Sequence, residues 1–157
     1  MIGFAGLSHL GLVTSIAVAS KGYKVVAYDP REDLIQNLNQ ENLPIFEPGL
    51  SEALKESRKN IIFTQNREDL KKVNLVYVAL DVETDSLNVA NFFHLEELID
   101  SIIPSLSLRT SLIIHSQVTP GFNRRMKSKY DRNDINFYYQ VETLIFGRAL
   151  ERALNPE

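Results

Sequence analysis

Short apolar runs alternate along the chain with longer stretches in which apolar residues recur at helical spacing. The apolar runs predict strands at residues 2–5, 24–28, 61–64, 75–80, 111–115 and 135–139. The helical spacing predicts helices at residues 10–20, 31–39, 49–57, 92–103, 122–129 and 144–154. Strands that alternate with helices form βαβ units. We therefore expect an α/β fold in which a doubly wound, mostly parallel sheet carries helices on both faces.

The composition is that of an ordinary globular protein, and it excludes several classes of function. The 157 residues suit one domain, with 44% hydrophobic and 24% charged residues. A net charge of −3 argues against nucleic-acid binding driven by overall charge. The sequence has no cysteine, which excludes disulfides, thiolate metal sites and a cysteine nucleophile within this chain. Because there is no apolar run of ~18 residues and no signal peptide, we expect a cytoplasmic protein without a membrane partner.

A glycine-rich loop, GLSHLG at residues 6–11, follows the first predicted strand and precedes the first predicted helix. The dinucleotide-binding fingerprint G-x-G-x-x-G occupies this place in a Rossmann fold, and here Ser8 replaces its second glycine. Asp29 ends the next predicted strand, near the ~20-residue spacing at which an acid binds the adenine ribose of NAD. These residues alone favour a nucleotide site over the alternative, which is a plain Rossmann-like turn with a surface aspartate at the end of a strand.

Longer blocks of sequence follow one another in a characteristic order. They are IGFAGLSHLGLVTS at residues 2–15, VVAYD at 25–29, LPIFEPGL at 43–50, SQVTPG at 116–121, VETL at 141–144 and ALNP at 153–156. Together they resemble the N-terminal NAD-binding domain of the UDP-glucose/GDP-mannose 6-dehydrogenase family, and the PIFEPGL block is the most specific match. The resemblance covers residues 1–157 as a single Rossmann domain, truncated before the end of the family's own domain.

The resemblance implies an activity, a cofactor and a set of site residues. These enzymes oxidise the C6 alcohol of a nucleotide sugar to a carboxylate in two NAD-dependent steps, through a thiohemiacetal on a cysteine. That cysteine and an assisting lysine lie in a region that this chain does not contain. Catalytic roles fall by resemblance on Glu142 and on Gln117, which replaces a threonine that positions the water or substrate oxygen. The resemblance places NAD on Gly6, Ser8, His9, Leu10, Gly11, Asp29 and Val82.

Several ligand-facing positions depart from the family pattern. Leu34 replaces a lysine, Val82 replaces a threonine that contacts the cofactor, and Phe146 replaces a second glutamate. Asp81 and Glu83 add negative charge near the expected diphosphate, which is unfavourable for an anion. We therefore expect NAD binding to be weakened or lost.

Two hypotheses for the function follow. In the first, the chain is the NAD-binding part of an enzyme that acts on a nucleotide sugar; in the second, it is a degenerate, non-catalytic Rossmann interaction module. A reading frame that continues past Glu157 into a cysteine-containing loop favours the first, and a stop codon there favours the second. The three histidines, His9, His94 and His115, lack metal-ligand spacing, so we expect no metal site.

The last predicted strand, at residues 135–139, is expected to end the sheet with an uncovered edge. An uncovered strand is a template for pairing with another chain. We therefore expect a homodimer, formed edge to edge or through the apolar residues Leu144, Ile145 and Phe146. The alternative is a monomer in which residues 144–154 fold back and shield the edge.

Overall fold

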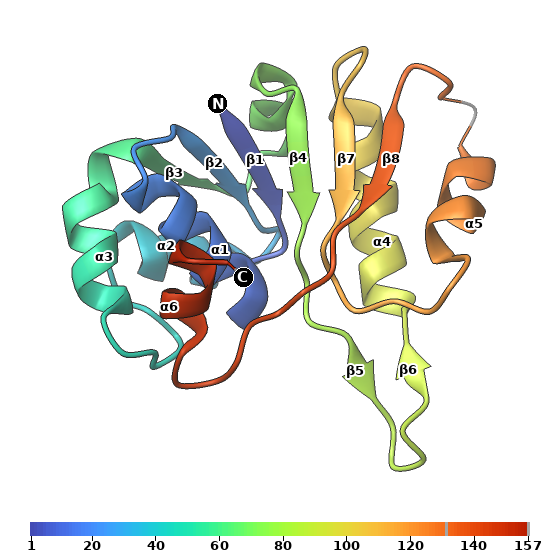
Figure 1. The fold of residues 1–157 in the computed structure, drawn as a ribbon. Helices are drawn as coiled ribbons and strands as arrows, with labels where there is room; N and C mark the ends of the chain where they lie inside the picture. The colour runs from blue at the N-terminus through green and yellow to red at the C-terminus, as the bar shows by residue number, and fades with distance from the viewer. Residues whose placement is uncertain (131, 157) are drawn as a thin grey trace.

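The computed structural model describes residues 1–130 and 132–156. They form an α/β domain built on a six-stranded parallel sheet (Figure 1). Its strands are β1 (Ile2–Ala5), β2 (Val25–Tyr28), β3 (Ile61–Thr64), β4 (Leu75–Val78), β7 (Ser111–Ile114) and β8 (Asn136–Tyr139). Their spatial order is β3-β2-β1-β4-β7-β8, and each neighbouring pair is parallel. The chain winds outward from β1 in both directions, which confirms the predicted doubly wound sheet.

Helices cover both faces of this sheet. They are α1 (His9–Ser20), α2 (Glu32–Asn39), α3 (Leu50–Ser57), α4 (Phe93–Ile102), α5 (Phe122–Lys129) and α6 (Ala149–Leu154), with short 3-10 helices at Arg58–Asn60, Arg67–Lys72 and Ile103–Ser105. Neighbouring residues of a strand point to opposite faces. In β1, Phe4 packs in a core cluster with residues of α1 and α3, whereas Ala5 packs in a second cluster with residues of α4 and α5. The predicted α/β class is therefore confirmed.

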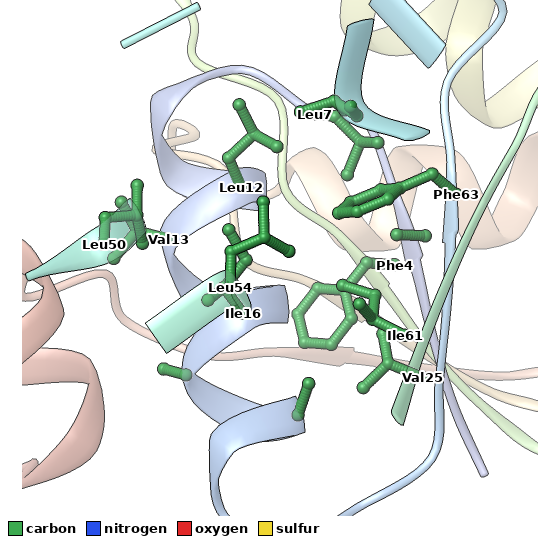
Figure 2. Packing of buried hydrophobic residues seen from close by; sticks show 14 of the residues in the cluster. Phe4, Leu7, Leu12, Val13, Ile16, Val25, Leu50, Leu54, Ile61 and Phe63 are labelled. Atoms are coloured by element: carbon green, nitrogen blue, oxygen red, sulfur yellow. The ribbon is translucent and has the colours of Figure 1, made fainter. Parts of the chain in front are cut away.

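The first core cluster fixes α1 against the sheet. Leu12 and Ile16, one helical turn apart on α1, are buried in the same cluster as Phe4 of β1 and Leu54 of α3 (Figure 2). Full burial of such a side chain stabilises the fold by about 1.5–3 kcal/mol. Because α1 begins in the glycine-rich loop, this packing also fixes the position of that loop.

Residues 83–91 form a hairpin that the sequence pattern did not predict. Its strands β5 (Glu83–Thr84) and β6 (Ala90–Asn91) are antiparallel, and the hairpin projects beyond the carboxyl ends of the large sheet (Figure 1). The Asp85 carboxylate accepts hydrogen bonds from the backbone N–H groups of Leu87 and Val89, which stabilises the turn. Strands of two residues are too short to show the alternation of apolar and polar residues that predicts a strand, so the sequence gives no periodic signal for this hairpin.

The prediction of one helix at residues 144–154 is wrong in its first half. Helix α6 begins at Ala149, and Gly147 before it has a φ of +80°, which lies outside the right-handed helical region. The Glu47 carboxylate accepts hydrogen bonds from the N–H groups of Gly147 and Ala149. A side chain about a hundred residues away therefore sets the start of this helix.

Strand β8 lies at the edge of the sheet, as the sequence predicted. Helix α6 packs against α1, at a distance from β8 along the sheet (Figure 1).

Within the described residues, no helix is both long enough and apolar enough to cross a membrane.

Candidate functional site

A cavity of about 720 Å³ lies at the carboxyl ends of the central strands. Its walls come from the loops after β1, β2 and β4 and from one side of α4. The strand order reverses at β1, between β2 and β4, and doubly wound sheets bind ligands at such a switch point. Four of the predicted cofactor residues, Gly6, Ser8, Asp29 and Val82, line this cavity together.

The two glycines of the loop are required for different reasons, a left-handed backbone at Gly6 and close backbone packing at Gly11. Gly6 has a φ of +88°, and its N–H donates to the Tyr28 carbonyl at 3.0 Å. A Cβ atom on Gly11 would lie 1.9 Å from the Gly6 carbonyl oxygen and 2.8 Å from that of Ala79. Gly11 therefore lets α1 approach the ends of β1 and β4 closely.

The first turn of α1 presents backbone N–H groups that have no partner inside the helix. The first helical hydrogen bond runs from Leu12 N–H to the Ser8 carbonyl, so the amides of residues 8–11 precede it. These amides and the helix dipole favour an anion. The Leu10 side chain is buried in the core, so Leu10 can contribute only its backbone to such a site.

The Ser8 hydroxyl connects the glycine-rich loop to the loop after β4. Its Oγ accepts a hydrogen bond from Asp81 N–H at 2.8 Å and lies 3.5 Å from the Ala79 carbonyl oxygen. The side chain that replaces the usual glycine is thus already engaged within the protein.

The Asp29 carboxylate is 2% exposed and fully paired. Its Oδ2 accepts from Leu7 N–H at 2.8 Å, and its Oδ1 accepts from Arg31 N–H at 3.0 Å. The Arg31 guanidinium adds Nε to Oδ1 at 2.8 Å and Nη2 to Oδ2 at 2.9 Å. This hydrogen bonding outweighs burial and raises the pKa of Arg31. Sequence reasoning missed Arg31, although a cation two residues after the expected ribose acid was a visible signal.

Carboxylates dominate the charge of the cavity lining. The described lining contains the acidic residues Asp29, Asp81, Glu83 and Glu97, and the basic residues Arg31 and His94. Leu34, at the position of the family's lysine, is buried in the core and adds no cation. The acidic side of this lining is unfavourable for a diphosphate.

His9 is directed away from the cavity, toward a buried glutamate of the PIFEPGL block. His9 Nε2 lies 2.7 Å from Oε1 of Glu47, and the exposed ring of Phe146 packs on His9 with 4.4 Å between centroids and the two ring planes inclined by 44°. Burial opposes the ionisation of Glu47, but hydrogen bonds from Gly147, His9 and Ala149 outweigh it and lower its pKa. Glu47 thus ties residues 147–149 to the first turn of α1.

The two predicted catalytic residues meet at the adjoining strand ends. The Gln117 amide Nε2 donates to Oε2 of Glu142 at 2.7 Å, and Leu144 N–H donates to the other carboxylate oxygen. Gln117 follows β7 and Glu142 follows β8, and both lie outside the lining of the 720 Å³ cavity. His115, buried at the end of β7, has its pKa lowered by burial, so it is a neutral core residue at pH 7.

This geometry defines an α/β domain in which the loop before α1 and the buried acid after β2 line one cavity at the switch point of the sheet. The chain belongs to the UDP-glucose/GDP-mannose dehydrogenase family, as its NAD-binding domain, because that family's model matches residues 1–157.

Similar proteins support this assignment. The UDP-N-acetyl-D-mannosamine dehydrogenase of Pyrococcus horikoshii is 30% identical over 96% of this chain, and the UDP-glucose 6-dehydrogenase of Rickettsia typhi is 28% identical over 99%. The chain spans only 38% and 37% of these relatives. Among solved structures, the Pyrococcus horikoshii UDP-D-ManNAc dehydrogenase has a TM-score of 0.86 at 26% identity, covering 97% of this chain and 38% of its own.

Proposed function

We propose that this chain binds NAD in the cavity at the switch point. The proposal rests on one observation, which is that Ser8 at the start of α1 and Asp29 after β2 line the same cavity. The amides at the start of α1 would hold the pyrophosphate, and the Asp29 carboxylate would accept from the hydroxyls of the adenine ribose. Membership of an NAD-binding domain family supports the same ligand.

We expect Asp29→Asn to weaken NAD binding at least about 10-fold, because hydrogen bonds to a charged acceptor contribute roughly 1.5–3 kcal/mol. The amide retains one oxygen for Leu7 N–H but no acceptor for Arg31 N–H, so circular dichroism checks that the variant is folded. Calorimetric titration with NAD measures the change. Asp33→Ala, which removes an exposed charge four residues further on, serves as the control. Equal affinities of Asp29→Asn and the unaltered chain would refute the ribose assignment.

The absolute affinity for NAD should be low. Leu34 and Val82 withdraw polar contacts, the Ser8 hydroxyl is engaged elsewhere, and Asp81 and Glu83 repel the diphosphate. Losing two or three contacts at about 1 kcal/mol each weakens binding roughly 10²-fold. A low-micromolar dissociation constant in the same titration would contradict this expectation.

We further propose that the chain serves a larger enzyme that oxidises the C6 alcohol of a nucleotide sugar. In that setting Gln117 and Glu142, which meet at 2.7 Å, would orient the water or substrate oxygen. A non-catalytic interaction module is the second candidate, favoured by Phe146, which replaces a family glutamate and instead packs against the His9 ring.

This chain alone should form no NADH when mixed with NAD and UDP- or GDP-sugars. The covalent route needs an activated thiol nucleophile, and the sequence contains no cysteine. Absorbance at the NADH band, compared with a control lacking protein, checks the result. NADH production above that control would show that a residue of this chain replaces the thiol.

We also propose that the chain self-associates through β8. Strand β8 forms the edge of the sheet, and Tyr138 and Tyr139 are exposed on it. Ile145 and Phe146 are exposed apolar residues in the loop that follows. Light scattering over a concentration series should show a dimer mass that decreases on dilution. A monomer mass up to high micromolar concentration would rule this association out.

A further inference from the structure

The Arg31 guanidinium occupies the face of Asp29 that opens into the cavity. Both residues line the cavity, but the Arg31 side chain is 53% exposed whereas the Asp29 side chain is 2% exposed. Asp29 is thus fixed within the protein, and Arg31 lies over it from the solvent side. The guanidinium can rotate away without disturbing the core.

All hydrogen-bonding positions of the Asp29 carboxylate are taken. A carboxylate offers roughly four acceptor sites. Two are filled by the backbone N–H groups of Leu7 and Arg31, which belong to the loop structure itself. The other two are filled by Nε and Nη2 of the Arg31 side chain, one on each oxygen. A ribose diol that approached Asp29 from the cavity would need the two positions that the Arg31 side chain fills.

We propose that Arg31 competes with the ribose diol for Asp29 and so reduces the affinity of this site for adenine nucleosides. This inference rests on the proposed binding of NAD in the cavity. A ribose can bind Asp29 only after the guanidinium has left, so each binding event includes the cost of breaking that ion pair. Because the Arg31 side chain is 53% exposed, water can solvate the guanidinium when it leaves Asp29, so the competition is modest and a ligand can overcome it.

The ligand for the test must separate this competition from long-range electrostatics. Arg31 also brings positive charge to a mostly acidic cavity, so its removal disfavours a diphosphate for an unrelated reason. Adenosine carries the diol and no charge. The analogue 2′,3′-dideoxyadenosine carries neither the diol nor a charge. Its affinity therefore measures every contact of the nucleoside except the one between the diol and Asp29.

The experiment titrates adenosine into the unaltered chain, Arg31→Ala, Arg31→Lys and Arg124→Ala, with binding followed by NMR chemical shifts. Arg124→Ala removes one exposed positive charge from α5, outside the cavity lining, and is the matched control. We expect Arg31→Ala to bind adenosine about 5-fold more tightly than the unaltered chain. The affinity of Arg31→Lys should be intermediate, because lysine cannot form the bidentate contact with Asp29. Arg124→Ala should bind adenosine as the unaltered chain does. For 2′,3′-dideoxyadenosine, Arg31→Ala and the unaltered chain should have equal affinities.

The outcomes are distinct. An equal or lower affinity of Arg31→Ala for adenosine, or a gain that persists with the dideoxy analogue, overturns the competition and leaves NAD binding intact. Tighter binding of NADP than NAD by the unaltered chain would identify Arg31 as a phosphate ligand and overturn it too. If neither adenosine nor NAD binds any variant at millimolar concentration, the proposed function and the competition both fail.

Discussion

Glu47→Ala is expected to lower the free energy of unfolding by about 3 kcal/mol at pH 7, because the buried Ala149 N–H left without an acceptor costs roughly 1–3 kcal/mol and the hydrogen bonds from Gly147 and His9 are lost as well. The Glu47 carboxylate accepts from the N–H groups of Gly147 and Ala149 and pairs with His9. Its loss releases the segment before α6 from the first turn of α1. Urea unfolding followed by circular dichroism measures the change.

Glu56→Ala is the matched control for this substitution. Glu56 is exposed on α3, and removing a surface glutamate should change the stability by no more than about 0.5 kcal/mol. Glu47→Gln should fall between the two, because its amide oxygen can still accept from one of the freed N–H groups. A loss below about 1 kcal/mol for Glu47→Ala would mean that residues 147–149 find other partners.

The same carboxylate gives the stability a defined dependence on pH. Hydrogen bonding lowers the pKa of Glu47 in the folded chain below its value in the unfolded chain, which is about 4.3. Its ionised form therefore contributes fully above about pH 4.3, and the contribution is lost as the pH falls through the lower, folded value. The stability difference between the unaltered chain and Glu47→Gln should thus shrink below about pH 4. A difference that stays constant down to pH 3 would exclude ionised Glu47 as its source.

Most of the fold could be predicted from the sequence because strands buried on both faces leave a strong signal. All four residues of β2 are buried, and its VVAY run is continuous and apolar. The failures lie where local pattern does not decide structure. The hairpin of β5 and β6 depends on the Asp85 turn, and the start of α6 depends on Glu47, which is distant in sequence.

Part of the candidate site could also be predicted from the sequence, and part depends on tertiary contacts. Gly6, Ser8 and Asp29 could be placed in one site because the strand-loop-helix order fixes which loops meet. The role of Glu47 could not, even though its sequence block is the most specific match to the family, because the contacts of a buried carboxylate depend on tertiary packing. Arg31 also escaped prediction, since its effect depends on which way a flexible side chain turns.

Gly11→Ala is expected to destabilise the chain by about 3 kcal/mol or more, since an added methyl group that the core cannot accommodate typically costs 1–3 kcal/mol. Here the obstacle is backbone rather than side chain. The new Cβ would lie 1.9 Å from the Gly6 carbonyl oxygen and 2.8 Å from that of Ala79, so no change of rotamer relieves the contact. Helix α1 must shift away from β1, and with it the amides proposed to hold the pyrophosphate.

Gly22→Ala separates this clash from the general effect of replacing a glycine. Gly22 follows α1 and has a φ of +89°, and no heavy atom of the residues that the structure describes lies within 4 Å of an added Cβ. Its replacement should cost only the backbone strain of a left-handed residue, about 1 kcal/mol. Urea unfolding should therefore rank Gly11→Ala well below Gly22→Ala in stability, and calorimetry on the folded fraction should show the larger loss of NAD affinity for Gly11→Ala. If Gly11→Ala were as stable as Gly22→Ala and bound NAD as well, the close approach of α1 to β1 would not be required for either folding or binding.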